Sequence, residues 1–479
     1  MKLSELIKNV ETKKIIGDCE VEISEIKTDS SSISKGNLFV CLNGANYDGH
    51  NFALEAEKYG AVAIVTEKKL DVFITQIIVN DTRKALSIIS ANFYKNAHKK
   101  LKIVGVTGTN GKTTTTYLIT SILMNSGVKC GIIGTLGIYY SGKFIEADLT
   151  TPDPLVLHKT FYDMVNDGVE VVVMEVSAHA IYLSKIYGID FEIGVFTNCT
   201  QDHLDFFKDM KNYSDTKIRF FIENNINHIV TNIDDNTGLD IYKKVKSTSY
   251  GLKNPSDIFA LDIKNTKNGV KFVMNLFDEV FVVKTNLLGE YNVYNCMASA
   301  VATKFLGVSG EDIVKGIEQL KGVSGRLEKV YDNRFMVFID YAHTPDGLEK
   351  TLEALKKTCA GRLICIFGCG GNRDKEKRHL MGEISGRIAD FTVITSDNPR
   401  FEEPMEIIWQ IEKGILKNSE NYVIVEDRKQ AIKYAVNYAK KGDTILIAGK
   451  GSEKYQEVFG IKRFYNDVDA LNEILENEI

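Results

Sequence analysis

Short apolar runs alternate with amphipathic stretches along most of the chain. This alternation is typical of βαβ units, in which helices join parallel strands. Nine runs predict strands, at residues 103–108, 169–177, 193–198, 228–234, 335–343, 363–371, 391–398, 422–427 and 443–451. Each run ends in a polar or glycine-rich segment. Because ligands of open α/β sheets bind at the carboxyl ends of strands, we expect the functional residues in these endings.

Length and local composition predict three domains. The chain has 479 residues, and domains average about 150 residues. The polar segment NAHKK (96–100) precedes the first strong parallel strand, and the glycine-containing segment GVSGRLE (322–328) precedes a second series of βα units. We therefore expect a mixed α/β domain at residues 1–98, a central domain at 99–326 and a second α/β domain at 327–479.

The overall charge excludes some function classes. Lys and Arg total 59 and Asp and Glu total 64, so the net charge of −5 argues against a nucleic-acid or membrane surface. No apolar run approaches the roughly 18 residues of a membrane helix, and the first residues lack the apolar core of a signal peptide. The eight cysteines contain no CxxC pair, which favours free thiols in a reducing compartment. We expect a cytoplasmic protein.

The segment 103–127 predicts a strand, a glycine-rich turn and a helix. Gly108 and Gly111 allow backbone N–H groups to approach phosphate oxygens, Lys112 adds a positive charge, and Thr113 offers a hydroxyl to Mg²⁺. The strict GxxxxGK[ST] pattern fails because Val106 stands at the first glycine. The apolar stripe of the expected helix is Leu118, Ile119, Ile122 and Leu123, with Gly127 as its C-cap. These features predict nucleotide phosphate binding.

The loop TGTNGKTT (107–114) resembles the ATP loop of the Mur ligase family. Further segments resemble blocks of that family in the same order: TTP (150–152), MEVSAH (174–179), FTNCTQDHLD (196–205), GEYNVYN (289–295), SGRLE (324–328), DYAHTPD (340–346), FGCGGNRDKEKR (367–378), SDNPR (396–400) and AGKGSEKYQ (448–456). The resemblance covers nearly the whole chain. It implies a mixed α/β N-terminal domain that binds a UDP-sugar, a central P-loop ATPase domain with a mainly parallel sheet, and a Rossmann-like C-terminal domain that binds an amino acid.

The resemblance also implies the chemistry. ATP phosphorylates a carboxylate, and an amine then displaces phosphate from the acyl phosphate. The implied ATP contacts are Gly108, Thr109, Asn110, Gly111, Lys112, Thr113, Thr114, Asn292, Asn295, Arg326, Asp340 and His343. The implied catalytic residues are Lys112, Glu175, His203 and Lys217. The implied Mg²⁺ ligands are Thr113, Glu175, His203 and a carbamylated Lys217. By themselves, these last three positions also fit a strand-end carboxylate, a loop histidine and a solvated helix lysine.

Within the family, the resemblance is to members that add the third residue of the peptidoglycan stem peptide. It implies that the UDP-N-acetylmuramoyl-dipeptide is held by Ser30, Thr150, Thr151, Ser177 and Lys185. It implies that the incoming amino acid is held by Arg373, Asp397, Asn398, Pro399, Arg400, Gly449 and Glu453. A guanidinium such as that of Arg400 forms a planar fork for a carboxylate. Because meso-diaminopimelate carries a distal carboxylate and lysine does not, we expect meso-diaminopimelate as the amino acid.

Several positions depart from the family pattern. Leu149 replaces an Asn, Ala178 a Ser, Leu183 a Gln, Lys185 an Arg and Ser452 a His. The changes to Leu183 and Lys185 remove hydrogen-bonding groups and a bidentate fork, so they leave open a sister ligase that adds lysine or uses a modified acceptor. A nucleotide-switch protein is the alternative from another class, although a switch needs no amino-acid clamp. A dinucleotide oxidoreductase is disfavoured because FGCGGNRD lacks the GxGxxG spacing. We expect a monomer with small-molecule substrates.

Overall fold

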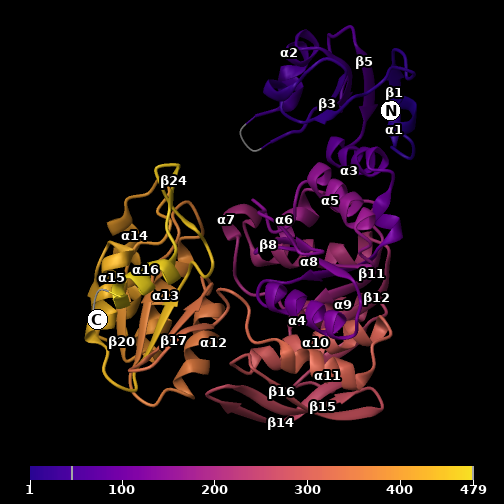
Figure 1. Cartoon of the computed structure of the whole chain (residues 1–479). Helices are drawn as coiled ribbons and strands as arrows, with labels where there is room; N and C mark the ends of the chain where they lie inside the picture. The colour runs from indigo at the N-terminus through magenta and orange to yellow at the C-terminus, as the bar shows by residue number, and fades with distance from the viewer. Residues whose placement is uncertain (45–46, 477–479) are drawn as a thin grey trace. The chain divides into compact units, whose positions relative to one another are not determined.

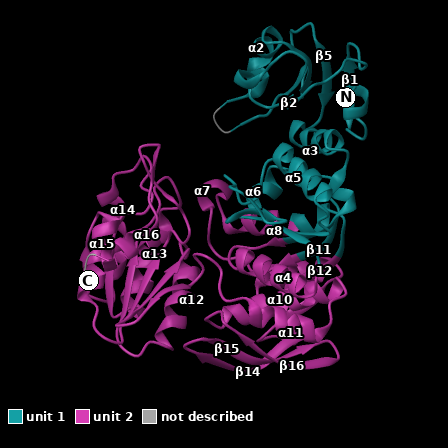
Figure 2. Cartoon of the chain, in the orientation of Figure 1, with its two compact units in different colours: residues 1–105, 128–194, 219–227 teal, residues 106–127, 195–218, 228–479 magenta. Residues whose placement is uncertain are grey.

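The computed structural model (Figure 1) describes residues 1–44 and 47–476. These residues form two compact units, shown in Figure 2. Unit 1 comprises residues 1–105, 128–194 and 219–227, and unit 2 comprises residues 106–127, 195–218 and 228–479. The last three residues of the expected C-terminal domain, 477–479, lie outside the described residues. Over the described ranges, no helix is both long enough and apolar enough to cross a membrane.

The N-terminal part of unit 1 is built on a sheet in the order β1-β5-β4-β3-β2. Strands β2, β3, β4 and β5 are parallel to one another, and β1 pairs with β5 in the antiparallel direction. Buried residues of β3, β4, β5 and α3, such as Val40, Val65, Ile77 and Leu86, share one core. The elements are α1 Leu3–Leu6, β1 Thr12–Ile16, β2 Ile26–Lys27, η1 Ser30–Ser32, β3 Asn37–Val40, η2 Gly49–Phe52, α2 Ala53–Lys58, β4 Ala61–Thr66, β5 Thr75–Val79, α3 Thr82–Phe93 and η3 Ala97–Lys100.

The second sheet has the strand order β16-β15-β14-β13-β12-β11-β6-β10-β7-β8-β9. Antiparallel meanders, β7 to β9 and β14 to β16, form its two edges. The strands are β6 Lys102–Thr107, β7 Cys130–Gly134, β8 Gly137–Tyr140, β9 Lys143–Ile145, β10 Val171–Glu175, β11 Phe191–Phe196, β12 Ile226–Asn232, β13 Thr248–Gly251, β14 Ile258–Thr266, β15 Gly269–Leu276 and β16 Glu279–Thr285. The helices are α4 Lys112–Asn125, α5 Pro154–Asn166, α6 Ala178–Tyr182, α7 Leu204–Phe207, α8 Met210–Glu223, α9 Asn236–Lys244, α10 Tyr291–Phe305 and α11 Gly310–Gln319.

The sequence predictions for this sheet are confirmed at four strands. The runs at 103–108, 169–177, 193–198 and 228–234 are β6, β10, β11 and β12, and three of these strands end two residues before the predicted limit. Helix α4 follows the glycine-rich turn as predicted. Its stripe of Leu118, Ile119, Ile122 and Leu123 is fully buried, and Gly127, at φ +76°, directly follows its C-cap. The meander of β14 to β16 was not predicted.

The C-terminal part of unit 2 is a sheet in the order β17-β18-β22-β19-β20-β21. Only β17 is antiparallel to its neighbour. The elements are β17 Glu328–Asp332, β18 Met336–Asp340, α12 Pro345–Lys356, β19 Leu363–Phe367, α13 Glu376–Ile388, β20 Phe391–Ile394, α14 Pro404–Ile415, β21 Tyr422–Ile424, α15 Arg428–Tyr438, β22 Thr444–Ala448, β23 Tyr455–Val458, β24 Ile461–Phe464 and α16 Asp467–Glu476. The five runs predicted here are β18 to β22.

Alternation of apolar residues along these strands gives the C-terminal sheet a core on each face. Cys365 and Phe367 of β19 pack with helices α12, α13 and α14, whereas Ile364 and Ile366 pack with α15 and α16. Helices therefore cover both faces, as predicted for a Rossmann-like domain. The arrangement leaves the carboxyl ends of β18, β19, β20 and β22 at one edge of the sheet. All eight cysteines are free, which confirms the expectation of thiols.

Candidate active site

The loop between β6 and α4 is packed too tightly for a side chain at either of its two glycines. Gly108 and Gly111 have φ angles of +151° and +86°. A Cβ atom on Gly108 would lie 1.9 Å from Thr197 Oγ1, and one on Gly111 would lie 2.6 Å from Asn295 Oδ1. The hydroxyl of Thr197 donates a hydrogen bond to the Asn110 carbonyl oxygen at 2.7 Å. The loop thus presents backbone N–H groups at the N-terminus of α4, where the helix dipole favours an anion.

Two side chains bring positive charge to this loop. Lys112 Nζ donates to the carbonyl oxygens of Gly108 and Thr109, both at 2.9 Å. Arg326 Nη2 donates to Thr113 Oγ1 at 2.9 Å, and its guanidinium lies 4.4 Å from the centre of the Tyr341 ring. Arg326 follows the glycine turn before β17, so the structure joins this turn to the start of α4. Both cations are placed to meet phosphate oxygens.

The other expected ATP contacts surround the same loop within unit 2. Asn295 Nδ2 donates to Asn292 Oδ1 at 2.8 Å, and both amides are buried on α10. Asp340 accepts backbone hydrogen bonds from Leu327 and Ala342, and burial raises the pKa of its carboxyl group. His343 Nδ1 lies 2.8 Å from the Tyr341 carbonyl oxygen. These residues lie far from the phosphate loop along the chain, but they belong to the same compact unit.

Lys217 on α8 is an amine without a hydrogen-bond partner in the described part of the chain. Its side chain is fully buried, and Nζ lies 3.6 Å from the centre of the Tyr213 ring. The hydroxyl of Tyr213 is 3.1 Å from Thr109 Oγ1, so this ring connects Lys217 to the phosphate loop. Burial, with a contribution from the Lys112 charge, lowers the pKa of Lys217 to about 7. A large fraction of this amine is therefore neutral and nucleophilic near neutral pH.

Asp202 was not predicted as a site residue, yet three basic side chains lie around its carboxylate. Its carboxylate is 3.3 Å from His203 Nε2, 3.5 Å from His343 Nε2 and 3.8 Å from Lys377 Nζ. Burial alone would raise the pKa of Asp202, but His343, His203 and Lys377 hold it well below its usual value. The sequence analysis singled out His203 of TQDHLD and not Asp202, because the sequence does not show which of these two neighbouring residues is buried.

Glu175 ends β10 in unit 1 and is buried. Its carboxylate accepts hydrogen bonds from the Thr135 backbone N–H at 2.9 Å and from the Thr135 hydroxyl at 3.1 Å. Three expected acceptor contacts lie beside it. Thr150 Oγ1 is 3.1 Å from Thr135 Oγ1, and Thr151 Oγ1 donates to the Glu175 carbonyl oxygen at 2.8 Å and to Ser177 Oγ at 3.3 Å. Thr135 is a further residue that the sequence did not single out.

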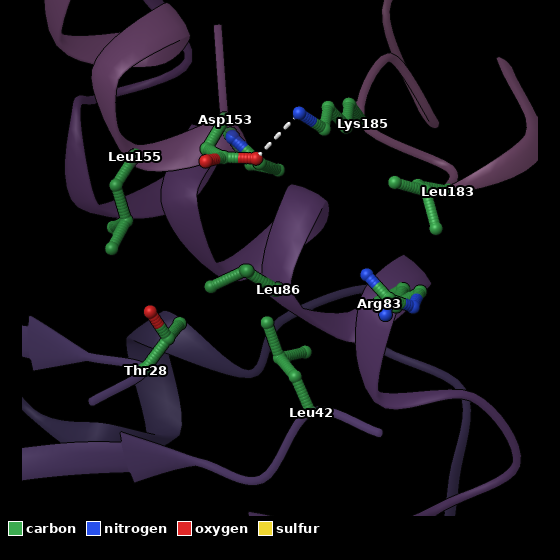
Figure 3. Close-up of a pocket in the computed structure, with 9 residues that line it drawn as sticks. Thr28, Leu42, Arg83, Leu86, Asp153, Leu155, Leu183 and Lys185 are labelled. Carbon is green, nitrogen blue, oxygen red and sulfur yellow. Dashed lines mark ion pairs between the residues drawn. The ribbon is translucent and has the colours of Figure 1, made fainter. Parts of the chain in front are cut away.

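A cavity of about 100 Å³ lies in unit 1 and is lined by Thr28, Leu42, Arg83, Leu86, Asp153, Pro154, Leu155, Leu183 and Lys185. Figure 3 shows Lys185 pointing toward Asp153, and their side chains form an ion pair at 2.8 Å. Two departures from the family pattern, Leu183 and Lys185, therefore line the same cavity. Ser30 is not part of this lining; its hydroxyl donates to Glu55 Oε2 at 3.3 Å.

The expected amino-acid residues gather at the carboxyl ends of β20 and β22. Asn398 Nδ2 donates to Glu453 Oε2 at 3.0 Å, and the fully buried Lys450 donates to both Asn398 Oδ1 and Glu453 Oε2 at 3.0 Å. A Cβ on Gly449 would lie 2.7 Å from Asp397 Oδ2. The set therefore surrounds the Asp397 carboxylate, and Lys450 is a member that the sequence analysis missed.

Arg400, Pro399 and Arg373 lie around this cluster on loops. Arg400 Nη1 donates to the Gly371 carbonyl oxygen at 2.8 Å, and its Nε is 3.4 Å from Glu457 Oε2. The Pro399 carbonyl oxygen would lie 1.8 Å from a Cβ on Gly371, so the two loops pack backbone to backbone. Arg373 is half exposed, with Nη1 at 3.9 Å from Asp205 Oδ2.

Fold and site together define a nucleotide-dependent enzyme with a phosphate loop and a separate cluster of polar side chains at the edge of the C-terminal sheet. Three family descriptions match in order: "Mur ligase family, catalytic domain" at residues 22–109, "Mur ligase middle domain" at 106–303 and "Mur ligase, glutamate ligase domain" at 325–451. The chain belongs to the Mur ligase family, whose members are ATP-dependent ligases, and it has the three-domain architecture of that family.

Curated relatives match over nearly the whole chain. UDP-N-acetylmuramoyl-L-alanyl-D-glutamate–2,6-diaminopimelate ligase 1 of Clostridium acetobutylicum is 47% identical, covering 98% of this chain and 97% of its own. The ligase of the same name from Clostridium tetani is 43% identical, covering 99% of both. A solved structure of a ligase with this name has a TM-score of 0.71 at 29% identity, covering 100% of this chain and 99% of its own. MurF from Acinetobacter baumannii, at 21% identity, shares the fold with a TM-score of 0.68, covering 99% of this chain and 98% of its own.

Replacing Asp202 by Asn is expected to destabilise the protein by about 3 kcal/mol, because the buried ammonium of Lys377 would lose its counter-charge. Asp332→Asn is the matched control, since its pair with Lys329, at 2.6 Å, is solvent-exposed and should contribute less than about 1 kcal/mol. Chemical denaturation measures both differences. Equal losses in the two variants would contradict the assigned role of Asp202.

Proposed function

We propose that this chain joins meso-diaminopimelate to UDP-N-acetylmuramoyl-L-alanyl-D-glutamate with hydrolysis of ATP to ADP and phosphate, in the synthesis of peptidoglycan precursors. The observation that carries the proposal is the match to curated relatives with that one activity in their names, at 43–47% identity over at least 98% of the chain. The substrates, ATP and a UDP-linked sugar, are cytoplasmic compounds. We therefore propose a cytoplasmic enzyme.

The three expected domains receive three binding roles in this proposal. Residues 1–98 would bind the UDP-sugar, residues 99–326 ATP, and residues 327–479 the amino acid. The acceptor carboxylate attacks the γ-phosphorus of ATP, and the bond from that phosphorus to the β–γ bridging oxygen breaks. The amine then attacks the acyl carbon, loses a proton, and expels inorganic phosphate. A single chain carries each set of residues, so we propose that a monomer suffices.

Phosphoryl transfer requires positive charge around the transferred group more than covalent catalysis. In unit 2, the N-terminus of α4, Lys112 and Arg326 supply that charge around the loop at Gly108 and Gly111. The hydrogen bond between Arg326 and Thr113 supports a role for the turn before β17 in closing the nucleotide site. Asn292, Asn295, Asp340 and His343 are proposed to contact the adenosine.

A magnesium site here would use few protein ligands. In the described ranges, no three His, Cys, Asp or Glu side chains gather to hold a metal ion. The amine of Lys217 is buried beside the charge of Lys112 and has no hydrogen-bond partner among the described residues, so its position suits an anion better than a cation. Attack of the neutral amine on CO₂, with release of one proton to solvent, would form a carbamate. That carbamate, Thr113 and His203 would then hold Mg²⁺, with Glu175 proposed from the sequence. When bound, the ion would neutralise charge on phosphate oxygens.

The cluster around Asp397 supports recognition of an amino acid with two charged ends. Asp397 and Glu453 provide carboxylates for an ammonium group, and Arg400 provides a guanidinium for the distal carboxylate. Asn398 is held between Lys450 and Glu453. The substrate's charges are thus complementary to groups that the sheet edge already holds in place.

A sister ligase acting on a modified acceptor is the second candidate. The cavity of unit 1 favours it, because Leu183 cannot hydrogen-bond and Lys185 is already paired with Asp153. Addition of lysine in place of diaminopimelate and a non-ligating nucleotide switch are the remaining alternatives. They differ in which product, if any, the protein forms.

Purified protein with ATP, Mg²⁺, UDP-N-acetylmuramoyl-L-alanyl-D-glutamate and meso-diaminopimelate is expected to release phosphate and form the tripeptide, identified by mass spectrometry. Lysine in place of diaminopimelate should give at least about tenfold lower kcat/KM, because one charge-assisted pair is lost. A product with lysine only would refute the amino-acid assignment. Phosphate release independent of both acceptor and amino acid would refute the ligase and favour the nucleotide switch.

Lys217→Ala is expected to lower kcat by at least about a hundredfold, since the proposed carbamate would help to hold the Mg²⁺ that neutralises charge on the phosphate oxygens. Wild-type protein depleted of CO₂ should lose activity and regain it with bicarbonate, whereas the variant should not respond. Carbamylation needs the neutral amine, so recovery should be faster above pH 7 than below it, given the pKa of about 7. A fully active Ala variant, or activity indifferent to CO₂, would overturn this role.

Arg400→Ala is expected to raise the KM for diaminopimelate by about tenfold or more, with little change in the KM for ATP, because the fork for the distal carboxylate is lost. Arg400→Lys should recover only part of this loss, since an ammonium cannot bond in bidentate form. Arg387→Ala, which removes a half-exposed guanidinium paired with Glu349, is the control. Steady-state kinetics with wild-type KM in Arg400→Ala would contradict the assignment.

A further inference from the structure

Arg428, the first residue of α15, carries a fully buried guanidinium that has no role in the proposed reaction. Its Nε and Nη2 donate to the two carboxylate oxygens of Asp467, both at 2.8 Å. Nη2 also donates to the Ala448 carbonyl oxygen, at the end of β22, at 3.0 Å. Asp467 is the first residue of α16 and is fully buried as well. Two helices and a strand therefore fix the plane of this guanidinium.

The remaining arm of Arg428 points at the amino-acid cluster. Its Nη1 is buried, has no hydrogen-bond partner among the described residues, and lies 4.0 Å from Asp397 Oδ2. The other carboxylate oxygen, Asp397 Oδ1, accepts from the Asn398 backbone N–H at 2.7 Å. On its other side, Oδ2 faces Gly449, where a Cβ would come within 2.7 Å. Asp397 is thus anchored through one oxygen, while the other stands between Arg428 and the space at Gly449.

The buried charges of this cluster are two cations, Arg428 and Lys450, and two carboxylates, Asp397 and Asp467. Arg428 forms its bidentate pair with Asp467 and still leaves one buried N–H without a hydrogen-bond partner among the described residues, on the side of Asp397. A purely structural pair between Arg428 and Asp467 would have no reason to leave that N–H unpaired beside a second carboxylate.

We propose that Arg428, locked by Asp467 of the last helix, is a positioning residue that orients and keeps anionic the Asp397 carboxylate for the amine-bearing end of the incoming amino acid. This inference rests on the proposed function, in which Asp397 receives an ammonium group. It extends the amino-acid site to α15 and α16, neither of which carries a residue of the sequence-derived set. Arg428 itself touches no substrate.

The electrostatic setting of Asp397 supports this role. Burial would raise the pKa of Asp397, but Lys450, Arg428, the Asn398 N–H and Arg400 hold it below its ordinary value. Tyr341, Tyr455 and Cys369 also interact with this carboxylate, and burial raises the pKa of each of them, so they are uncharged at neutral pH. Glu453 adds a negative charge to the same cluster through Asn398 and Lys450. Removing the Arg428 charge should therefore raise the pKa of Asp397 and shift binding of the amine toward higher pH.

The test compares Arg428→Gln, Arg428→Lys and Asp467→Asn with the wild-type enzyme under saturating ATP and acceptor. Arg428→Gln should raise the KM for diaminopimelate by about tenfold or more, because a positive charge 4.0 Å from the Asp397 carboxylate is removed, while the KM values for ATP and acceptor change less than about twofold. Its acid limb in kcat/KM for diaminopimelate should move to higher pH. Arg428→Lys should restore the acid limb and part of the KM.

Asp467→Asn is nearly isosteric, so it keeps the test valid if Arg428→Gln does not fold, as judged by thermal unfolding. Without its counter-charge, the guanidinium can turn to Asp397 and compete with the amine, so the KM for diaminopimelate should again rise selectively. The control is Lys429→Gln, which breaks an exposed pair with Glu473, at 2.6 Å, between the same two helices. This control should have wild-type kinetics.

A folded Arg428→Gln enzyme with wild-type KM and pH profile would overturn the inference. Equal increases in all three KM values would also overturn it, because they would indicate a general structural role. Both comparisons require a wild-type protein that ligates diaminopimelate. Failure of the wild-type protein to ligate diaminopimelate would instead refute the proposed function, so the two failures are distinguishable.

Discussion

The close packing of the loop between β6 and α4 is the constraint on which the nucleotide site depends. Gly108 and Gly111 leave no room for a side chain against Thr197 and Asn295, so the residue that follows β11 and a residue of α10 define the position at which α4 begins. That position fixes where the dipole of α4 and the side chains of Lys112 and Thr113 are presented. Arg326 meets the same turn through Thr113, and the C-terminal part of unit 2 is thereby tied to the phosphate loop.

Buried charge is the second theme of the structure. Lys217, Asp202 and Arg428 are each almost fully removed from water, and each faces one of the expected binding sets. Burying a charge is costly unless partners compensate it. Asp202 has compensating cations, whereas Lys217 and the Nη1 arm of Arg428 lack hydrogen-bond partners in the described ranges. The proposed carbamate at Lys217 and the proposed positioning of Asp397 by Arg428 both start from these two groups.

The sequence predicted the parallel strands well and their ends poorly. Apolar runs identify β6, β10, β11, β12 and β18 to β22, because strands buried on both faces need continuous apolar residues. Most predicted runs extended into polar endings that are loops. The meander of β14 to β16 was missed because its exposed face interrupts the apolar pattern, as in the alternating burial of β14. Asp202, Lys450 and Arg428 were missed because charged residues carry no sequence signal of being buried.

The sequence alone determined the class of fold, the phosphate loop and the family, since these depend on local periodicity and on short blocks in a fixed order. Only the tertiary structure decided which charged side chains meet. Asp397 and Arg428 are 31 residues apart, with α14 and β21 between them, and Asp467 lies farther along the chain, yet all three converge at one edge of the C-terminal sheet. Asp397 and Arg428 converge because they follow the parallel strands β20 and β21, whose carboxyl ends lie together. Asp467 follows the separate β23-β24 pair and reaches the same edge at the start of α16. The strength of an electrostatic interaction depends on the distance between the two charges in space and on the exclusion of water, and the linear sequence contains neither.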